Sequence, residues 1–371
     1  MTTQAPTEHE QPLEMPFDEE SRPVVVITGG SAGVGRATAL AFAKKGATVA
    51  ILARGRTSLD AAVKEIDGAG DGTCAGYQVD VSDYEAVRDA AGQIEETLGP
   101  IDIWVNNAMV SVFSPVKEMQ PAEYRRVTEV NYLGYVHGTL VALELMTPRD
   151  RGTIIQVGSA LSYRGIPLQS AYCATKHAIQ GFNDSLRAEL RHDGSNIRVS
   201  SVDLPGMNTP QFLWSKSRMP FRAQPVPPIY EPEVAARAIL WLSTHREREL
   251  NVGWPTVVTK LGNVIAPGLL DRYLGRTGYD SQMTDQVEPL DRASNLWEPV
   301  DEDFGARGPF TERAHDDSKQ LWVATHTSRT LRNVVGVAVV FGAALTALSL
   351  CGKLARSLTH RGGSTEVKRD C

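Results

Sequence analysis

The sequence predicts an α/β fold built on a doubly wound parallel sheet. Between residues 22 and 260, short apolar runs alternate with stretches of helical pattern. The apolar runs are continuous, which is typical of parallel strands that are covered by helices on both faces. A glycine-rich turn directly follows the first run and precedes the first helix. We therefore expect residues 22–260 of the 371-residue chain to form a single doubly wound domain.

The expected elements follow one another in a regular order. The strand runs are Val24–Ile27, Thr48–Leu52, Ala75–Val79, Ile101–Val105, Thr153–Val157 and Arg198–Val202. The helical stretches are Arg36–Lys45, Thr57–Ile66, a helix from Ser82, 121–146 and 170–192. Ser82 is followed three residues later by Glu85, which is the spacing of a capping box. We expect Ser82 to cap the third helix.

The two ends of the chain differ from this central part. Residues 1–21 are acidic and rich in proline, so we expect a disordered arm. We expect a short helical C-terminal extension over residues 261–300, a polar linker over 301–332 and a basic tail over 353–371. Residues 333–352 carry no charge and are just long enough to span a bilayer. They predict either a membrane helix or a buried globular helix.

Composition and charge exclude several classes of protein. Six acidic residues lie before Arg22, and without them acidic and basic residues balance, so there is no basic footprint for nucleic acid. Four widely spaced cysteines without a Cys-x-x-Cys favour neither a disulfide scaffold nor a metal site. The N-terminus lacks the pattern of a secretory signal. We expect a cytoplasmic protein, anchored to a membrane if residues 333–352 insert.

The glycine turn predicts a nucleotide site. It reads Thr28-Gly-Gly-Ser-Ala-Gly-Val-Gly35 and lies between a buried strand and a helix start. Small residues there let the backbone approach a pyrophosphate, and the helix N–H groups point at it. A glycine cluster elsewhere would be an ordinary turn, and the spacing lacks the usual Gly-x-Gly-x-x-Gly. Its position after the first strand favours the nucleotide.

The end of the second strand bears on which dinucleotide binds. A carboxylate there accepts hydrogen bonds from the adenosine ribose and favours NAD, whereas an arginine can pair with the 2′-phosphate of NADP. The strand ends Leu52-Ala-Arg-Gly-Arg56, without a carboxylate. Arg54 therefore favours NADP, with NAD kept open because a solvated loop charge is the alternative for Arg54.

Tyr172 and Lys176 stand four residues apart and so share one helix face. Such a pair arises easily by chance. It gains weight because Ser159 ends the fifth strand, at the sheet edge where α/β proteins bind ligands. Asn131 adds a polar group to an otherwise apolar helix segment.

Together these motifs resemble the classical short-chain dehydrogenase/reductase family, over roughly residues 23–215. The turn is similar to the family's Thr-Gly-x-x-x-Gly-x-Gly, and Asn106-Asn107-Ala108 to its Asn-Asn-Ala-Gly, with Met109 in place of the glycine. The resemblance implies a Rossmann-like catalytic domain and a homo-oligomer formed through the helices at 121–146 and 170–192. It implies contacts to the cofactor from Gly29, Ser31, Gly33, Val34, Gly35, Arg54, Asp80, Val81, Asn107, Ala108, Tyr172, Lys176, Pro205, Gly206 and Thr209.

The resemblance also implies a catalytic tetrad and the role of each member. Tyr172 is the general acid/base, and Lys176 lowers its pKa and holds the nicotinamide ribose. Ser159 binds the substrate oxygen, and Asn131 steadies a water that relays protons. Asp80 is implied to contact the adenine, or else only to cap the next helix. Thr209 stands about one residue earlier than is usual for the family, which leaves its contact to the nicotinamide amide open.

Apolar side chains flank the expected catalytic residues and predict a small-molecule carbonyl or alcohol substrate of apolar, bulky shape. Those assigned to the substrate, with Ser159 and Tyr172, are Leu161, Leu168, Met207, Phe212 and Trp214. They would serve equally as a lid packed on the core. Two alternatives to an oxidoreductase remain. One is an epimerase or dehydratase of the same superfamily, disfavoured because Ala32 stands where its second glycine belongs. The other is a non-enzymatic nucleotide-binding or membrane scaffold protein.

Overall fold

A computed structural model describes residues 22–289 and 291–327. The chain divides into two compact units after Leu321, and the central sheet with its covering helices belongs to the first. The acidic arm expected at residues 1–21 lies outside the described residues, as do the apolar segment 333–352 and the basic tail. In the described part of the chain, no helix has both the length and the apolar character needed to cross a membrane.

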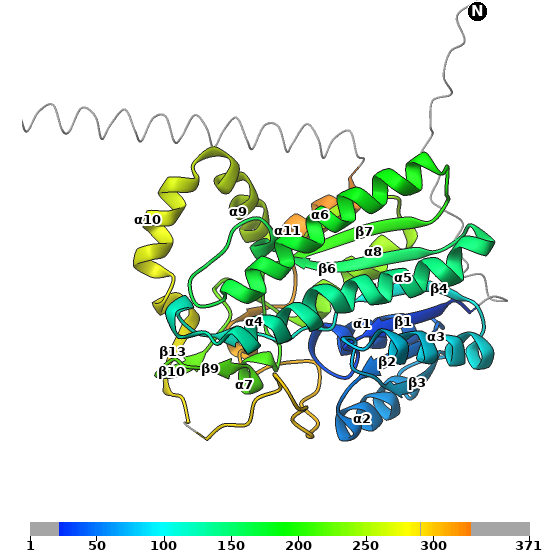
Figure 1. Cartoon of the computed structure of the whole chain (residues 1–371), viewed down its shortest axis with the longest axis horizontal. Coiled ribbons are helices and arrows are strands. Elements are labelled where there is room, and N and C mark those ends of the chain that lie inside the picture. Colours follow the sequence, from blue (N-terminus) through cyan, green and yellow to red (C-terminus); the bar gives the residue numbers. More distant parts are fainter. Residues whose placement is uncertain (1–21, 290, 328–371) are drawn as a thin grey trace, which may run out of the picture. The chain divides into compact units, whose positions relative to one another are not determined.

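A seven-stranded parallel sheet forms the centre of the first unit (Figure 1). Its strands lie in the order β12-β7-β6-β4-β1-β2-β3. Their bounds are β1 Val24–Thr28, β2 Thr48–Ala53, β3 Thr73–Gln78, β4 Ile101–Asn106, β6 Thr153–Ser159, β7 Arg198–Leu204 and β12 Glu249–Asn251. The order reverses between β1 and β4, which creates a crevice at their carboxyl ends. The predicted parallel, Rossmann-like sheet is confirmed.

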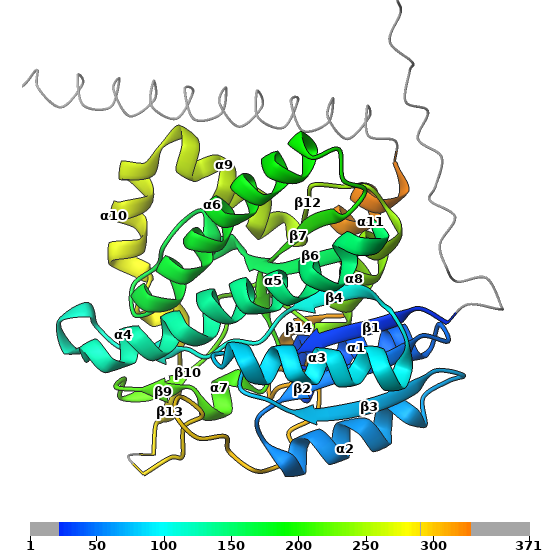
Figure 2. The same ribbon diagram turned by 45° about the vertical axis from the view of Figure 1, so that its right-hand side comes forward.

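Helices cover both faces of the sheet, because its strands are apolar on both sides. Helices α1 (Gly33–Ala43), α2 (Arg56–Asp67) and α8 (Pro232–Thr244) pack together on one face. Helices α3 (Tyr84–Leu98), α5 (Gly134–Met146) and α6 (Ser170–His192) cover the other, and Figure 2 shows them side by side. Between the layers, Val25, Val26 and Ile27 of β1 are completely buried.

Two helical predictions need correction. Asp83, not Ser82, caps α3, since its carboxylate accepts a hydrogen bond from the Ala86 amide at 3.1 Å. The stretch 121–146 is helical throughout, but it divides into α4 (Pro121–Thr128), a π-helical turn at Glu129–Leu133 and α5. Single π turns often occur at functional sites, and this one contains Asn131.

The C-terminal boundaries also differ from those expected. A helix α9 (Gly253–Ile265) spans the predicted boundary at residue 260 and forms a hairpin with α10 (Pro267–Thr277). The prediction of a polar linker over residues 301–332 is wrong for residues 301–321, because these residues pack on the domain. Within it, β14 (Ala314–His315) pairs with β11 (Ile229–Tyr230), and Phe310 is buried against Phe113 and Phe212. The described residues up to Leu321 thus form one compact unit.

Short elements complete the fold around the carboxyl edge of the sheet. Strand β8 (Gly206–Met207) joins β11 and β14, and β5 (Val112–Phe113) pairs with β9 (Lys216–Ser217). Strands β10 (Phe221–Ala223) and β13 (Met283–Val287) form an antiparallel ribbon. The remaining helices are α7 (Gln211–Trp214) and α11 (Lys319–His326).

Candidate active site

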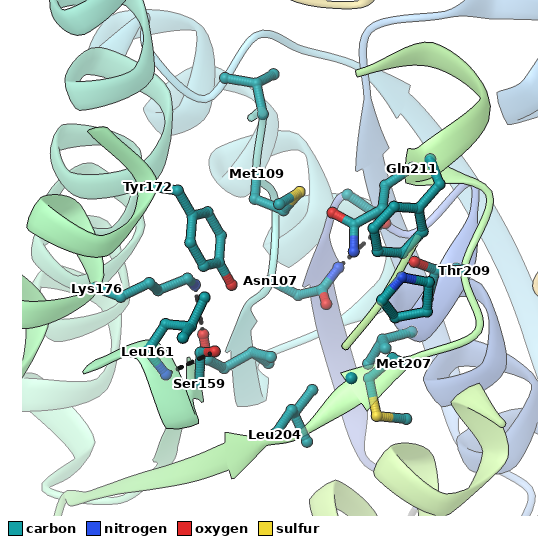
Figure 3. Close-up of a pocket in the computed structure, with 18 of the residues that line it drawn as sticks. Asn107, Met109, Ser159, Leu161, Tyr172, Lys176, Leu204, Met207, Thr209 and Gln211 are labelled. Atoms are coloured by element: carbon teal, nitrogen blue, oxygen red, sulfur yellow. Dashed lines mark hydrogen bonds between the residues drawn. The ribbon is translucent and has the colours of Figure 1, made fainter. Parts of the chain in front are cut away.

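A cavity of about 960 Å³ opens at the carboxyl ends of the central strands. Its walls come from the segments that follow β1, β2, β3, β4, β6 and β7, so the strand order itself places them together. In Figure 3, Tyr172 and Lys176 lie on one side of this cavity and Met207, Thr209 and Gln211 on the other, with Asn107 and Met109 between them. This is the crevice that a doubly wound sheet offers to a ligand.

The glycine turn forms one wall, and close packing explains its glycines. Gly29 has a φ of +67°, and a Cβ there would lie 2.8 Å from the Ala108 Cα. A Cβ on Gly35 would lie 2.2 Å from the Gly29 oxygen. Gly29, Ser31, Gly33 and Val34 line the cavity, whereas Gly35 allows helix α1 to begin directly behind the turn. The amide end of α1 therefore faces the cavity, as phosphate binding requires.

The Asn106-Asn107-Ala108 motif braces β4 against β1. The Asn107 amide donates to the Thr28 carbonyl at 3.0 Å and to the Gly29 carbonyl at 3.2 Å. Asn106 is fully buried and its amide donates to Thr139 and Gln156. Both asparagines hold the scaffold of the turn, and Asn107 and Ala108 also line the cavity.

Arg54 and Asp80 meet at the end of the cavity beside β2 and β3. Their charged groups are 3.9 Å apart, and both residues and Val81 line the cavity. Asp80 does not cap α3 but accepts hydrogen bonds from Ser82 and Arg126. Burial raises the pKa of Asp80, yet these hydrogen bonds outweigh it and hold the pKa below its ordinary value. Burial also disfavours the charged form of Arg54, and so it lowers the pKa of this guanidinium.

The predicted catalytic residues converge from β6 and α6. Tyr172 and Lys176 share the face of α6 that points into the cavity, and Ser159 ends β6 beside them (Figure 3). The Lys176 ammonium lies 5.7 Å from the centre of the Tyr172 ring. Burial raises the pKa of the Tyr172 phenol, and a hydrogen bond with Ser159 opposes the rise. Burial lowers the pKa of Lys176 to about 7.

Asn131 lies behind the cavity rather than in its lining. Its side-chain oxygen accepts from the Val110 amide at 2.8 Å, and its amide donates to the Val110 carbonyl at 2.9 Å. Asn131 therefore fixes the segment after β4. Lys176 donates instead to the Val157 carbonyl at 2.7 Å and to the Tyr135 hydroxyl at 3.0 Å. A second phenol thus contacts the lysine that the sequence predicts to be catalytic.

Pro205, Gly206 and Thr209 line the cavity opposite Tyr172. Thr209 is buried, and its hydroxyl has no hydrogen-bond partner among the described residues. A buried hydroxyl of this kind ordinarily finds a partner, so a ligand at this place would satisfy it. The glycine turn lines the same cavity, and together with this orphaned group it shows that the residues present fit a nicotinamide dinucleotide.

The opposite end of the cavity is apolar. Of the residues predicted for the substrate, Leu161, Met207, Phe212 and Trp214 line the cavity with Ser159 and Tyr172. Leu168 does not, because it is buried in the core; its backbone has a φ of +70°. A large part of the apolar wall comes from the α9–α10 hairpin, which the sequence did not reveal as part of the site: Trp254, Val258, Leu270, Tyr273 and Leu274.

Sequence reasoning also missed Arg126 and the segment after residue 294. Arg126 lies on α4, yet its side chain is buried and reaches both Asp80 and the Leu296 carbonyl, the latter at 3.0 Å. Asn295, Pro299 and Glu302 line the cavity beside Arg54, although the sequence predicted only a helical extension and a polar linker there. Neither the arginine nor this segment belongs to a recognisable motif.

Comparisons with known proteins agree with the geometry. The family model for short chain dehydrogenases matches residues 23–218. The "Uncharacterized oxidoreductase YxnA" of Bacillus subtilis is 31% identical over 323 residues, which are 86% of this chain and 88% of the relative. The 3-oxoacyl-[acyl-carrier-protein] reductase FabG of Thermotoga maritima is 31% identical over 224 residues, covering 60% of this chain and 90% of that protein.

Solved structures give the same result. An alcohol dehydrogenase from Thermococcus sibiricus, complexed with 5-hydroxy-NADP, is 26% identical with a TM-score of 0.55, and covers 62% of this chain and 96% of its own. A metagenomic short-chain oxidoreductase in complex with NADP is 30% identical with a TM-score of 0.52, at 62% and 96% coverage. The chain belongs to the short-chain dehydrogenase family and is an NAD(P)-dependent oxidoreductase.

Proposed function

We propose that the protein transfers hydride between NADP(H) and the carbonyl or alcohol carbon of an apolar small molecule, with Tyr172 as general acid/base. One observation carries the proposal: Ser159, Tyr172 and Lys176 converge on a cavity that joins the glycine turn to an apolar wall. A bound nicotinamide supplies or accepts the hydride. The chain must then position the carbonyl and handle one proton.

Each catalytic side chain suits one of these tasks. The Ser159 hydroxyl lies beside the Tyr172 phenol and holds the substrate oxygen within its reach. The phenol gives its proton to that oxygen in reduction and takes it back in oxidation. Because burial raises the pKa of Tyr172, the phenol needs a nearby positive charge, which the Lys176 ammonium provides. In our proposal Asn131 positions the segment after β4 and steadies the water through which protons leave.

Arg54 supports the choice of NADP. It is a cation at the end of β2, it lines the cavity, and the stretch Leu52–Arg56 offers no carboxylate in its place. Two of the protein's structural neighbours hold NADP or a derivative. Asp80 and Val81, which also line this end, would contact the adenine. NAD remains the alternative cofactor.

Turnover of a carbonyl panel with NADPH tests the proposed chemistry. Tyr172→Phe is expected to lower kcat by at least about a hundredfold with little change in NADPH affinity, because only the acidic proton is lost. Tyr77→Phe is the matched control: Tyr77 lies on β3, the change removes only an exposed hydrogen bond with Thr97 of α3, and full activity should remain. Equal rates in wild type and Tyr172→Phe would contradict the assignment. Cofactor binding without turnover in every protein would favour the scaffold alternative.

Cofactor preference is tested separately. Arg54→Asp should weaken NADPH binding about tenfold or more while NADH binding holds or improves, since a carboxylate repels the 2′-phosphate and accepts from the ribose. Arg88→Asp, on the exposed side of α3, controls for the change in net charge. An unchanged ratio of the two dissociation constants would show that Arg54 does not contact the phosphate.

Assembly and location complete the proposal. We propose a cytoplasmic homo-oligomer that assembles through α4, α5 and α6, where Leu133 and Leu140 are exposed. Sedimentation of the purified protein tests the oligomer, and a monomer at micromolar concentration would contradict it.

Residues 333–352 are proposed as a membrane anchor on their sequence alone. A full-length chain that remains wholly soluble after fractionation with a carbonate wash would contradict the anchor.

A further inference from the structure

Residues 295–305, here called the C-terminal strap, lie along the cavity beyond the segment that the family model matches. The strap begins beside Arg54 and Arg126. Arg54 donates to the carbonyls of Asn295 and of Trp297, the latter at 3.0 Å. Arg126 donates to the Leu296 carbonyl at 3.0 Å, and Leu296 itself is completely buried. Two arginines therefore fix the first part of the strap through its backbone.

The second part of the strap is fixed along α2 and the glycine turn. The Thr57 amide, in the first turn of α2, donates to the Asp301 carboxylate at 2.8 Å. Asp303 forms an ion pair with the buried Arg36 of α1. The Gly33 amide donates to the Gly305 carbonyl at 3.1 Å. The strap thus spans from the end of β2 to the start of α1.

This path makes the strap a wall of the cavity. Asn295, Pro299, Val300, Glu302 and Phe304 all line it. Phe304 also contacts the Trp214 ring of α7, with 4.6 Å between ring centres. The gold segment that passes below α7 toward α2 in Figure 1 shows this course. A ligand that lies between Arg54 and the glycine turn is therefore covered by the strap.

Asn295 has a buried polar group that the protein leaves unsatisfied. Its backbone amide donates to the Trp214 carbonyl at 3.0 Å, and its backbone carbonyl accepts from Arg54. Its side-chain oxygen is buried and finds no hydrogen-bond partner among the described residues. An acceptor left in this state costs free energy, which a donor on a bound ligand would recover.

We propose that the strap forms the outer wall of the adenosine half of the cofactor site, and that the Asn295 side chain accepts a hydrogen bond from the bound dinucleotide. The inference rests on the proposed function, because it assumes that the nucleotide lies beside Arg54. The 3′-hydroxyl of the adenosine ribose, which NADPH and NADH share, is a donor of the required kind. The side chain binds the cofactor, and the backbone of the same residue holds Arg54.

Fluorescence titration of the protein with NADPH and with NADH, in the absence of substrate, tests the inference. Asn295→Ala removes the side-chain acceptor and keeps both backbone hydrogen bonds, so Arg54 stays in place. We expect the dissociation constants of both cofactors to rise about tenfold. Asp291→Ala, an exposed change shortly before the strap, should leave both constants unchanged. Urea unfolding of both variants confirms that they fold like the wild type.

The possible results distinguish the role of Asn295 from the proposed binding of NADP(H) itself. Unchanged dissociation constants in a folded Asn295→Ala protein overturn the inference and leave the proposed cofactor intact. A wild-type protein that binds neither cofactor overturns both. If Asn295→Ala lost affinity for NADPH alone, the effect would come from the contact between Arg54 and the 2′-phosphate of NADPH. That result would also overturn the role of the Asn295 side chain.

Discussion

The ammonium group of Lys176 donates a hydrogen bond of 3.0 Å to the hydroxyl of Tyr135, and both residues are almost completely buried. The Tyr135 hydroxyl in turn donates to the Val157 carbonyl at 3.0 Å. The same ammonium lies 4.5 Å from the centre of the Tyr135 ring. Since burial lowers the pKa of Lys176 to about 7, the charged lysine depends on these few contacts. We therefore predict that Tyr135 positions the proposed catalytic lysine.

Replacing Tyr135 by phenylalanine should make Lys176 easier to deprotonate. The ring stays over the ammonium, but the charged form loses one acceptor, so the pKa of Lys176 falls further below its ordinary value. The basic limb of kcat/KM against pH should then move down by about one pH unit. Tyr132→Phe, on the same helical stretch and packed on Phe182, is the control and should keep the wild-type profile. A basic limb that stays in place in Tyr135→Phe would contradict this role.

Gly35 and Gly92 both lie in helices, but only Gly35 packs closely against the glycine turn. In Gly35→Ala the new methyl would lie 2.2 Å from the Gly29 oxygen and 2.6 Å from the Asn107 amide nitrogen. The turn must move, so we expect NADPH binding to be lost and unfolding free energy to fall by about 1–3 kcal/mol. Gly92 in α3 has nothing within 4 Å of such a methyl.

Gly92→Ala should therefore raise the unfolding free energy by up to about 1 kcal/mol, the helix-propensity difference between the two residues. It should bind NADPH like the wild type. Urea unfolding and fluorescence titration measure both effects on both proteins. If Gly35→Ala bound the cofactor normally, the close approach of α1 to the turn would not be needed for binding.

The parts of the site that the sequence predicted are those in which a side chain or a glycine does the work. The glycine turn, Ser159, Tyr172 and Lys176 occur at spacings that the sheet order makes meaningful, and the structure brings them to one cavity. The strap escaped prediction for a physical reason. Asn295, Trp297 and Gly305 act through backbone carbonyls, which every residue has.

Two smaller errors have similar causes. Ser82 and Asp83 are adjacent and both can cap a helix, so the sequence alone did not decide between them. The structure shows that Ser82 is occupied by Asp80 and Arg126, the latter a contact made across 44 residues from α4. Leu168 shares the apolar character of its neighbours that line the cavity, yet its side chain is buried in the core. The residue type alone does not show whether an apolar side chain lines the cavity or packs in the core.

Asp203 gives the protein a measurable pH dependence of stability. It is fully buried on β7 and accepts hydrogen bonds from Tyr163 at 2.9 Å and from Gln180 at 3.3 Å. Burial raises the pKa of Asp203 to about 7. The folded protein therefore holds this proton more tightly than the unfolded chain does. Stability from this group is complete below about pH 4 and is lost as the pH rises through about 7.

Asp203→Asn removes that titration and should flatten the decline. Between pH 5 and pH 8 the wild type should lose up to about 3 kcal/mol of unfolding free energy more than the variant loses. Urea unfolding at several pH values in this interval measures the difference. The same slope in both proteins would show that Asp203 stays ionised in the folded state throughout.

The α9–α10 hairpin should determine how large an apolar substrate the site accepts. Arg164 lies between β6 and α6 and forms an ion pair with Asp271 of α10. Asn263 of α9 donates a hydrogen bond to the carbonyl of the neighbouring Tyr163 at 2.8 Å. These bonds fix the hairpin to the segment between β6 and α6. Trp254 lines the cavity from α9 and still exposes 47% of its surface, so a substrate can cover it.

Trp254→Ala should therefore affect long substrates more than short ones. An alkyl chain that covers the indole buries on the order of 50 Å² of apolar surface, worth about 1 kcal/mol. We expect kcat/KM for 2-decanone to fall about fivefold and that for 2-butanone to stay within about twofold. Val264→Ala, on the same helix but outside the cavity lining, is the matched control. An equal fall for both ketones would mean that Trp254 supports the fold of the hairpin, because a contact with the alkyl chain acts only where the chain reaches it.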